Sequence, residues 1–184
     1  RLRHYGHFMI RRQAGFSVLD FVLAMGVVSA IVALGATFGM NALRQGEQQT
    51  AFASAMTDVW QATERAIIDE WHLSGCRTLA APPSLSSLVE HYDAPAYLLT
   101  LPYAITIDYR TAPSVTVSGG VTLTATLPEG MSGFSLKPVL TPLAQSVRVT
   151  ERSVVLYYNI ASIQSPLQHQ YFDAETGCMK GDYS

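Results

Sequence analysis

The chain has 184 residues, a length that suits one modest domain with an appendage. Only 14% of its residues are charged, against roughly a quarter in ordinary soluble domains. It carries 12 basic and 14 acidic residues and shows neither a basic stripe nor an arginine-rich arm, so the composition argues against a nucleic-acid partner.

Residues 16–40 form an apolar run whose only charged side chain is Asp20. As a helix the run would be about 38 Å long, which exceeds a hydrocarbon core of about 30 Å. Basic residues before a span stay in the cytoplasm, so the N-terminus is expected there and the C-terminal part is expected to be translocated. The arginines that precede the run are Arg1, Arg3, Arg11 and Arg12.

Three simpler interpretations compete with a specialised anchor. A cleaved secretory signal would have a small-residue site such as residues 33–36, although its apolar region usually spans about 7–15 residues. The pair Arg11-Arg12 is also found in twin-arginine export signals, but such pairs are common. A plain single-pass anchor fits the length and explains neither Gly15 nor Asp20.

Asp20 is the unusual residue, because a carboxylate at the centre of a bilayer costs about 2.5–3.5 kcal/mol and normally has a partner. Cleavage after Gly15 would create one, the α-amine of Phe16, which lies four residues before Asp20 and so on the same helical face. Asp20 either pairs with this amine on a neighbouring subunit or stabilises the N-terminal end of its own helix.

Residues 9–20 read MIRRQAGFSVLD, with two basic residues, a glycine, a phenylalanine and an acid ahead of the apolar run. This order resembles the class III signal of type IV prepilins and type II secretion pseudopilins, and the resemblance extends to about Leu73. It implies cleavage between Gly15 and Phe16 and N-methylation of Phe16. Asp20 stands where the family usually has glutamate.

The resemblance also implies a leader over residues 1–15, whose true start we place at Met9. It implies a structural subunit of a type IV pilus, with a type II secretion pseudopilin or a tip adhesin as alternatives. We favour a minor subunit, because of the aspartate and because no proline interrupts the helix before Pro82.

The partners implied are a prepilin peptidase that is also a methyltransferase, other pilin or pseudopilin subunits, an inner-membrane assembly platform and membrane lipid. The expected location is the bacterial inner membrane before assembly, and a periplasmic or extracellular filament afterwards. The resemblance implies no enzymatic activity and no cofactor. Phosphate-binding loops and the GxSxG and HExxH motifs do not occur in the sequence.

Beyond the apolar run, residues 41–72 are expected to continue the same helix with an amphipathic pattern, up to a C-cap at Gly75. The whole helix would run from Phe16 to His72. Its apolar stripe is expected to pack on the sheet of the same chain: Phe52, Met56, Val59, Thr63, Ile67 and Trp71.

Residues 73–184 are predicted to form a β-rich globular head, so the fold class is α+β with the helix on an antiparallel sheet. After Pro82-Pro83 we expect a short helix over residues 84–91 and a strand over 103–109. Two further strands are predicted around a turn at Gly119-Gly120, and a second hairpin turns near Glu151-Arg152. The strands are expected to form a meander.

Cys76 and Cys178 are predicted to form a disulfide if this part of the chain leaves the cytoplasm. A zinc site that uses both cysteines with His72, His91 and His169 is an alternative, although its spacing matches no zinc finger. A calcium site formed by Asp173, Glu175 and Asp182 is a further alternative. We favour the interpretation of these residues as a solvated tail and a turn before Cys178. We therefore predict that no metal binds.

Overall fold

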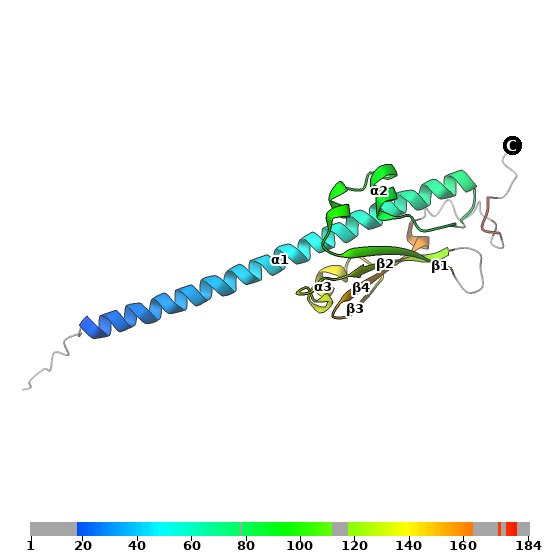
Figure 1. Cartoon of the computed structure of the whole chain (residues 1–184). Coiled ribbons are helices and arrows are strands. Elements are labelled where there is room, and N and C mark those ends of the chain that lie inside the picture. Colours follow the sequence, from blue (N-terminus) through cyan, green and yellow to red (C-terminus); the bar gives the residue numbers. More distant parts are fainter. Residues whose placement is uncertain (1–17, 78, 112–117, 164–172, 174–175, 180–184) are drawn as a thin grey trace, which may run out of the picture. The chain divides into compact units, whose positions relative to one another are not determined.

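The computed structural model describes residues 18–77, 79–111, 118–163, 173 and 176–179 (Figure 1). The chain divides into two compact units, Arg1–Gln45 and Gly46–Ser184. Helix α1, Val18–Ser74, contributes to both units. The fold is α+β, as predicted, and the predicted helix is confirmed over the described residues, although it ends at Ser74 instead of His72.

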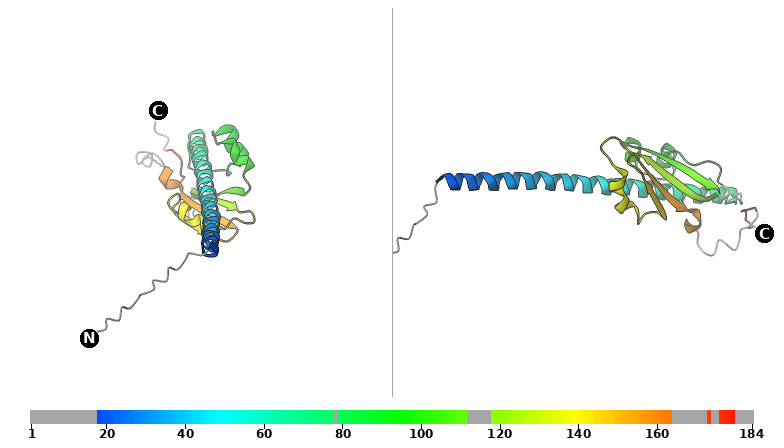
Figure 2. Two further views of the ribbon diagram at one scale, coloured as in Figure 1. Left: turned by 90° about the vertical axis from the view of Figure 1, so that its left-hand side faces the viewer. Right: turned by 90° about the horizontal axis from the view of Figure 1, so that it is seen from below.

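The second unit contains the C-terminal part of α1, a four-stranded antiparallel sheet and several short helices (Figures 1 and 2). The C-terminal part of α1 covers one face of the sheet. The other elements are α2 (Leu85–His91), the 3-10 helix η1 (Ala96–Thr100), β1 (Ala104–Thr111), β2 (Ser118–Thr126), α3 (Gly133–Leu140), β3 (Ser146–Val149), β4 (Ser153–Asn159) and the 3-10 helix η2 (Ile160–Ile163).

The predicted apolar stripe of α1 is confirmed, since all six of its residues are buried. The one polar member, Thr63, is satisfied because its hydroxyl donates to the carbonyl of Val59 at 2.7 Å. The predicted C-cap is also confirmed. Gly75 adopts the left-handed conformation, with φ at +64°, and its N–H donates to the carbonyl of Trp71 at 2.9 Å.

The inner face of the sheet meets this stripe, because alternate residues of its three longer strands point to the same side. Aromatic contacts join the two layers: Trp60 stacks on Tyr158 with ring centroids 4.0 Å apart, and Phe52 meets Tyr103 at 4.8 Å. The inner-face residues are Ile105, Ile107, Val121, Leu123, Ala125, Val154, Leu156 and Tyr158.

The predicted turn at Gly119-Gly120 is wrong, because both glycines lie within β2. Gly120 pairs with Arg110 on one side and with Asn159 on the other. A side chain at Gly120 would overlap the ring of Tyr157 on the neighbouring strand. The glycine is therefore needed for close packing within the sheet and not for a chain reversal.

The predicted meander is also wrong, since the strand order is β1-β2-β4-β3. The chain crosses from β2 to the far edge through α3, which the sequence analysis did not predict, and β4 then returns to pair with β2. Burial explains the order: alternate residues of β4 are fully buried, whereas the four residues of β3 are exposed or half-buried. The more apolar strand occupies the central position.

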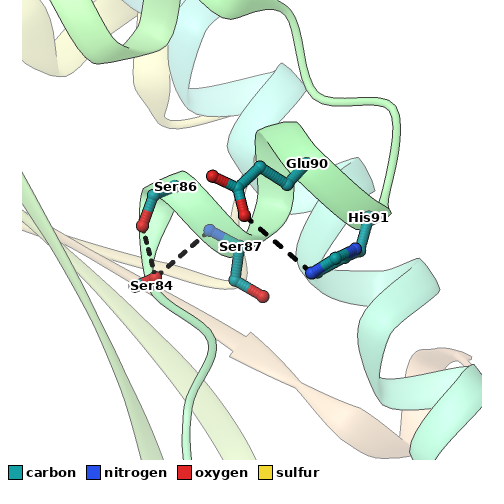
Figure 3. A network of polar contacts seen from close by, with 5 residues as sticks. All are labelled: Ser84, Ser86, Ser87, Glu90 and His91. Carbon is teal, nitrogen blue, oxygen red and sulfur yellow. Dashed lines mark hydrogen bonds and ion pairs between the residues drawn. The ribbon is translucent and has the colours of Figure 1, made fainter.

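The short helix predicted after Pro82-Pro83 is confirmed as α2 (Figure 3). Ser84 is its N-cap, and its hydroxyl accepts the N–H of Ser87 at 3.2 Å. That hydroxyl also lies 2.9 Å from the hydroxyl of Ser86. This cap satisfies a donor that the helix itself leaves unpaired, and it sets the point at which α2 begins.

Buried tyrosines make the fold sensitive to alkali. Burial raises the pKa of Tyr103 and of Tyr158 to about 12, from an ordinary value of 10.0. Burial, and then the hydrogen bond of 2.5 Å that its hydroxyl donates to Asp58, raises the pKa of Tyr97 to about 12 as well. Folding therefore holds these protons to a higher pH than the unfolded chain does.

The stability supplied by these tyrosines is complete below pH 10 and is lost as the pH rises toward 12. We expect the thermal unfolding midpoint of the full chain in detergent to fall over that range, with tyrosinate absorbance appearing on unfolding. Tyr158→Phe, which keeps a ring to stack on Trp60, should reduce the fall. Titration of all tyrosines near pH 10 in the folded chain would contradict this prediction.

Candidate functional site

The part of α1 in the first unit is apolar around its whole circumference. A helix of this kind is stable only when lipid or other protein covers it. By length and composition α1 is able to cross a membrane from Phe21 onward, although signal sequences share these properties. The exposed large apolar residues of this part are Val18, Phe21, Val22, Leu23, Met25, Val27, Val28, Ile31, Val32, Leu34, Phe38, Met40 and Leu43.

The predicted processing residues, Gly15 and Phe16, lie outside the described residues. Asp20 lies in the first turn of α1 as it is described. The pairing of its carboxylate with the amine of Phe16 stays a prediction. The structure shows the helix that carries Asp20 and the exposed apolar residues that follow it.

Cys76 and Cys178 form the predicted disulfide, which closes a loop across 102 positions of sequence. The two cysteines also face each other in a short antiparallel bridge. The N–H of Arg77 donates to the carbonyl of Gly177 at 2.8 Å. The N–H of Met179 donates to the carbonyl of Gly75, also at 2.8 Å. The disulfide therefore ties the end of α1 to a segment near the C-terminus.

The disulfide argues against the zinc alternative, because neither cysteine sulfur is then a thiolate that can bind the metal. His72 and His91 are exposed, and His169 lies outside the described residues. Within the part of the chain that the structure describes, no three His, Cys, Asp or Glu side chains gather as a metal would need.

Asp173 forms the turn that we predicted before Cys178. Its carboxylate accepts the N–H of Thr176 at 3.1 Å, and its carbonyl accepts the N–H of Gly177 at 2.8 Å. This carboxylate is therefore used locally, as Asp side chains often are in turns. The other two residues of the calcium alternative, Glu175 and Asp182, lie outside the described residues.

A cleft of about 580 Å³ opens beside the last turns of α1. Sequence reasoning did not find it, because its walls come from four separate segments: α1, the loop before α2, α2 with its C-cap, and β1. The one local sign is that two acids, Asp69 and Glu70, lie between Ile67 and Trp71 of the buried stripe. The lining residues are Ala66, Asp69, Glu70, Leu73, Ser74, Ala80, Ala81, Pro83, Ser87, Tyr92 and Tyr109.

The structure has a long N-terminal helix whose first part is apolar and whose second part packs on a four-stranded antiparallel sheet. The architecture is pilin-like. Comparison of the chain with protein-family models, with curated proteins and with solved structures finds no match. The exposed apolar helix and the disulfide are consistent with a membrane or extracytoplasmic location.

Proposed function

We propose that this chain is a structural subunit, of the minor type, in a type IV pilus or a related filament. The observation that carries the proposal is the uncovered apolar surface of residues 18–45 on a helix whose next turns pack on a sheet. The sequence pattern from Arg11 to Asp20 supports the same conclusion. The chain acts by assembly and not by catalysis.

In this proposal a prepilin peptidase cleaves between Gly15 and Phe16 and methylates the new terminus. The subunit waits in the bacterial inner membrane, with its N-terminus in the cytoplasm and its globular part outside. An assembly platform then moves it into the filament, where contacts with lipid are replaced by contacts with the apolar helices of other subunits. Asp20 compensates the amine of an adjacent subunit during this exchange.

The same features fit a type II secretion pseudopilin, which differs in the system it serves and not in its chemistry of assembly. A role in recognition at a filament tip is favoured by a separate observation, the cleft of about 580 Å³ in the globular part. The two roles are compatible, since one uses the first part of α1 and the other uses the second unit.

The test is the N-terminus of the mature protein from its native host. We expect mass spectrometry to find Phe16 as the first residue with a single added methyl group, in a host with an active prepilin peptidase. Deletion of the peptidase should leave the leader attached. A mature terminus within residues 33–40 would instead identify a secretory signal, and would contradict assembly through this helix.

A further inference from the structure

The cleft in the second unit has acidic, aromatic and apolar surfaces in one place. Asp69 and Glu70 supply carboxylates, and Tyr92 and Tyr109 supply aromatic rings from two other segments. The volume of about 580 Å³ lies within the usual range of ligand sites. No Lys, Arg or His is among the lining residues, all of which belong to the described part of the chain.

Among the described residues no ion pair neutralises the two carboxylates. Glu70 accepts the N–H of Ala80 at 2.7 Å, and Asp69 accepts the hydroxyl of Tyr92 at 3.5 Å. The nearby cation Arg65 donates instead to the carbonyl of Tyr92 at 3.0 Å. The ion pairs found among the described residues involve other acids, Glu90 and Glu129.

The tyrosines do not compensate these charges either. Burial raises the pKa of Tyr109, and the charge of Glu70 raises it further. Burial and then Asp69 raise the pKa of Tyr92. Both phenols are therefore neutral at physiological pH, and tyrosine is a residue type that favours cations, because the face of an aromatic ring attracts positive charge.

The remaining walls suit an aliphatic chain. Ala66 is buried, and Ala81 and Pro83 provide apolar surface from the loop. Leu73 also lines the cleft and is 82% exposed, so it offers an apolar edge at the surface. Such an edge beside a polar cleft is typical of protein recognition, where a long basic side chain inserts its apolar stem.

We propose that the cleft binds the side chain of a lysine or arginine that belongs to a protein partner. The stem lies along Ala81, Pro83 and Leu73, and the charged group lies between the carboxylates and the two rings. This inference does not depend on the proposed role in a filament, because every residue that carries it belongs to the second unit.

The test uses the full ¹⁵N-labelled chain in detergent micelles, titrated with acetylated and amidated Gly-Lys-Gly and Gly-Arg-Gly. The amide of Ala80 reports on the cleft, because it donates to Glu70. We expect a saturable shift of this amide with both basic peptides and none with Gly-Gln-Gly. Asp69→Asn and Glu70→Gln keep the size of each side chain and should each weaken binding about fivefold or more.

The matched control is Glu90→Gln, which removes an exposed acid on α2 that does not line the cleft (Figure 3). This variant should bind within about twofold of the original chain, since screened surface charges contribute little. Equal weakening by Glu90→Gln, or an equal shift with the glutamine peptide, would overturn the proposal. Tighter binding of free putrescine than of either peptide would assign the cleft to a small amine instead of a protein.

Discussion

Replacement of both Cys76 and Cys178 by serine is expected to lower the free energy of unfolding of the globular unit by about 2–4 kcal/mol. The disulfide spans 102 positions of sequence, and the chain-entropy model assigns about 4.7 kcal/mol to a closed loop of about 100 residues. Measured effects are usually smaller, because strain and residual structure in the unfolded chain reduce the gain. Denaturant unfolding of the full chain in detergent measures the difference.

The loss should also be local. The backbone bond between Arg77 and Gly177, which flanks the disulfide, is expected to exchange its amide proton faster in the double variant. A reducing agent should destabilise the original chain and leave the double variant unchanged, which separates the disulfide from other effects of reduction. Equal unfolding midpoints for the two chains would show that the linkage contributes nothing to stability.

Replacement of Asp20 by alanine is expected to leave cleavage after Gly15 largely intact and to reduce incorporation into filaments about tenfold or more. The physical reason is the pairing proposed above, because an amine in an apolar helix bundle without its carboxylate stays an uncompensated charge. Incorporation is measured as the ratio of chain in sheared filaments to chain in the inner membrane.

Asp20→Glu is the matched control, since it keeps the charge and introduces the residue that is usual at this place in type IV prepilins, whose signal the N-terminal sequence resembles. It should assemble at least as well as the original chain. The amount of Asp20→Ala protein in the membrane should not fall, because removal of a charge favours insertion. Normal incorporation of Asp20→Ala would contradict the pairing model and leave the carboxylate with a role at the end of its own helix only.

Local sequence patterns were sufficient for much of the second unit. The spacing of Phe52, Met56, Val59 and their successors identified the buried face of α1, since helical periodicity places these residues on one side whatever they contact. Gly75 identified the C-cap of α1 through short-range backbone chemistry. The pairing of Cys76 with Cys178 followed from the cysteine count, because the sequence contains no third cysteine.

The predictions that failed depended on contacts between distant residues. Gly119-Gly120 has the composition of a turn, but Tyr157, 37 residues after Gly120, requires a glycine beneath its ring within β2. The order of the strands followed from which strand is more apolar on the folded sheet, and α3 provided the crossing. A strand pattern records which face is buried and does not record its neighbours.

The sequence alone therefore established the apolar helix, the signal-like sequence before it, the buried stripe and the disulfide, because each depends on composition or on the spacing of residues along the chain. The folded chain was needed for the strand order and for the cleft, whose carboxylates come from α1 and whose rings come from the α2 C-cap and from β1. Residues so far apart along the chain meet only after the sheet and the helices have packed, and no local pattern encodes that meeting.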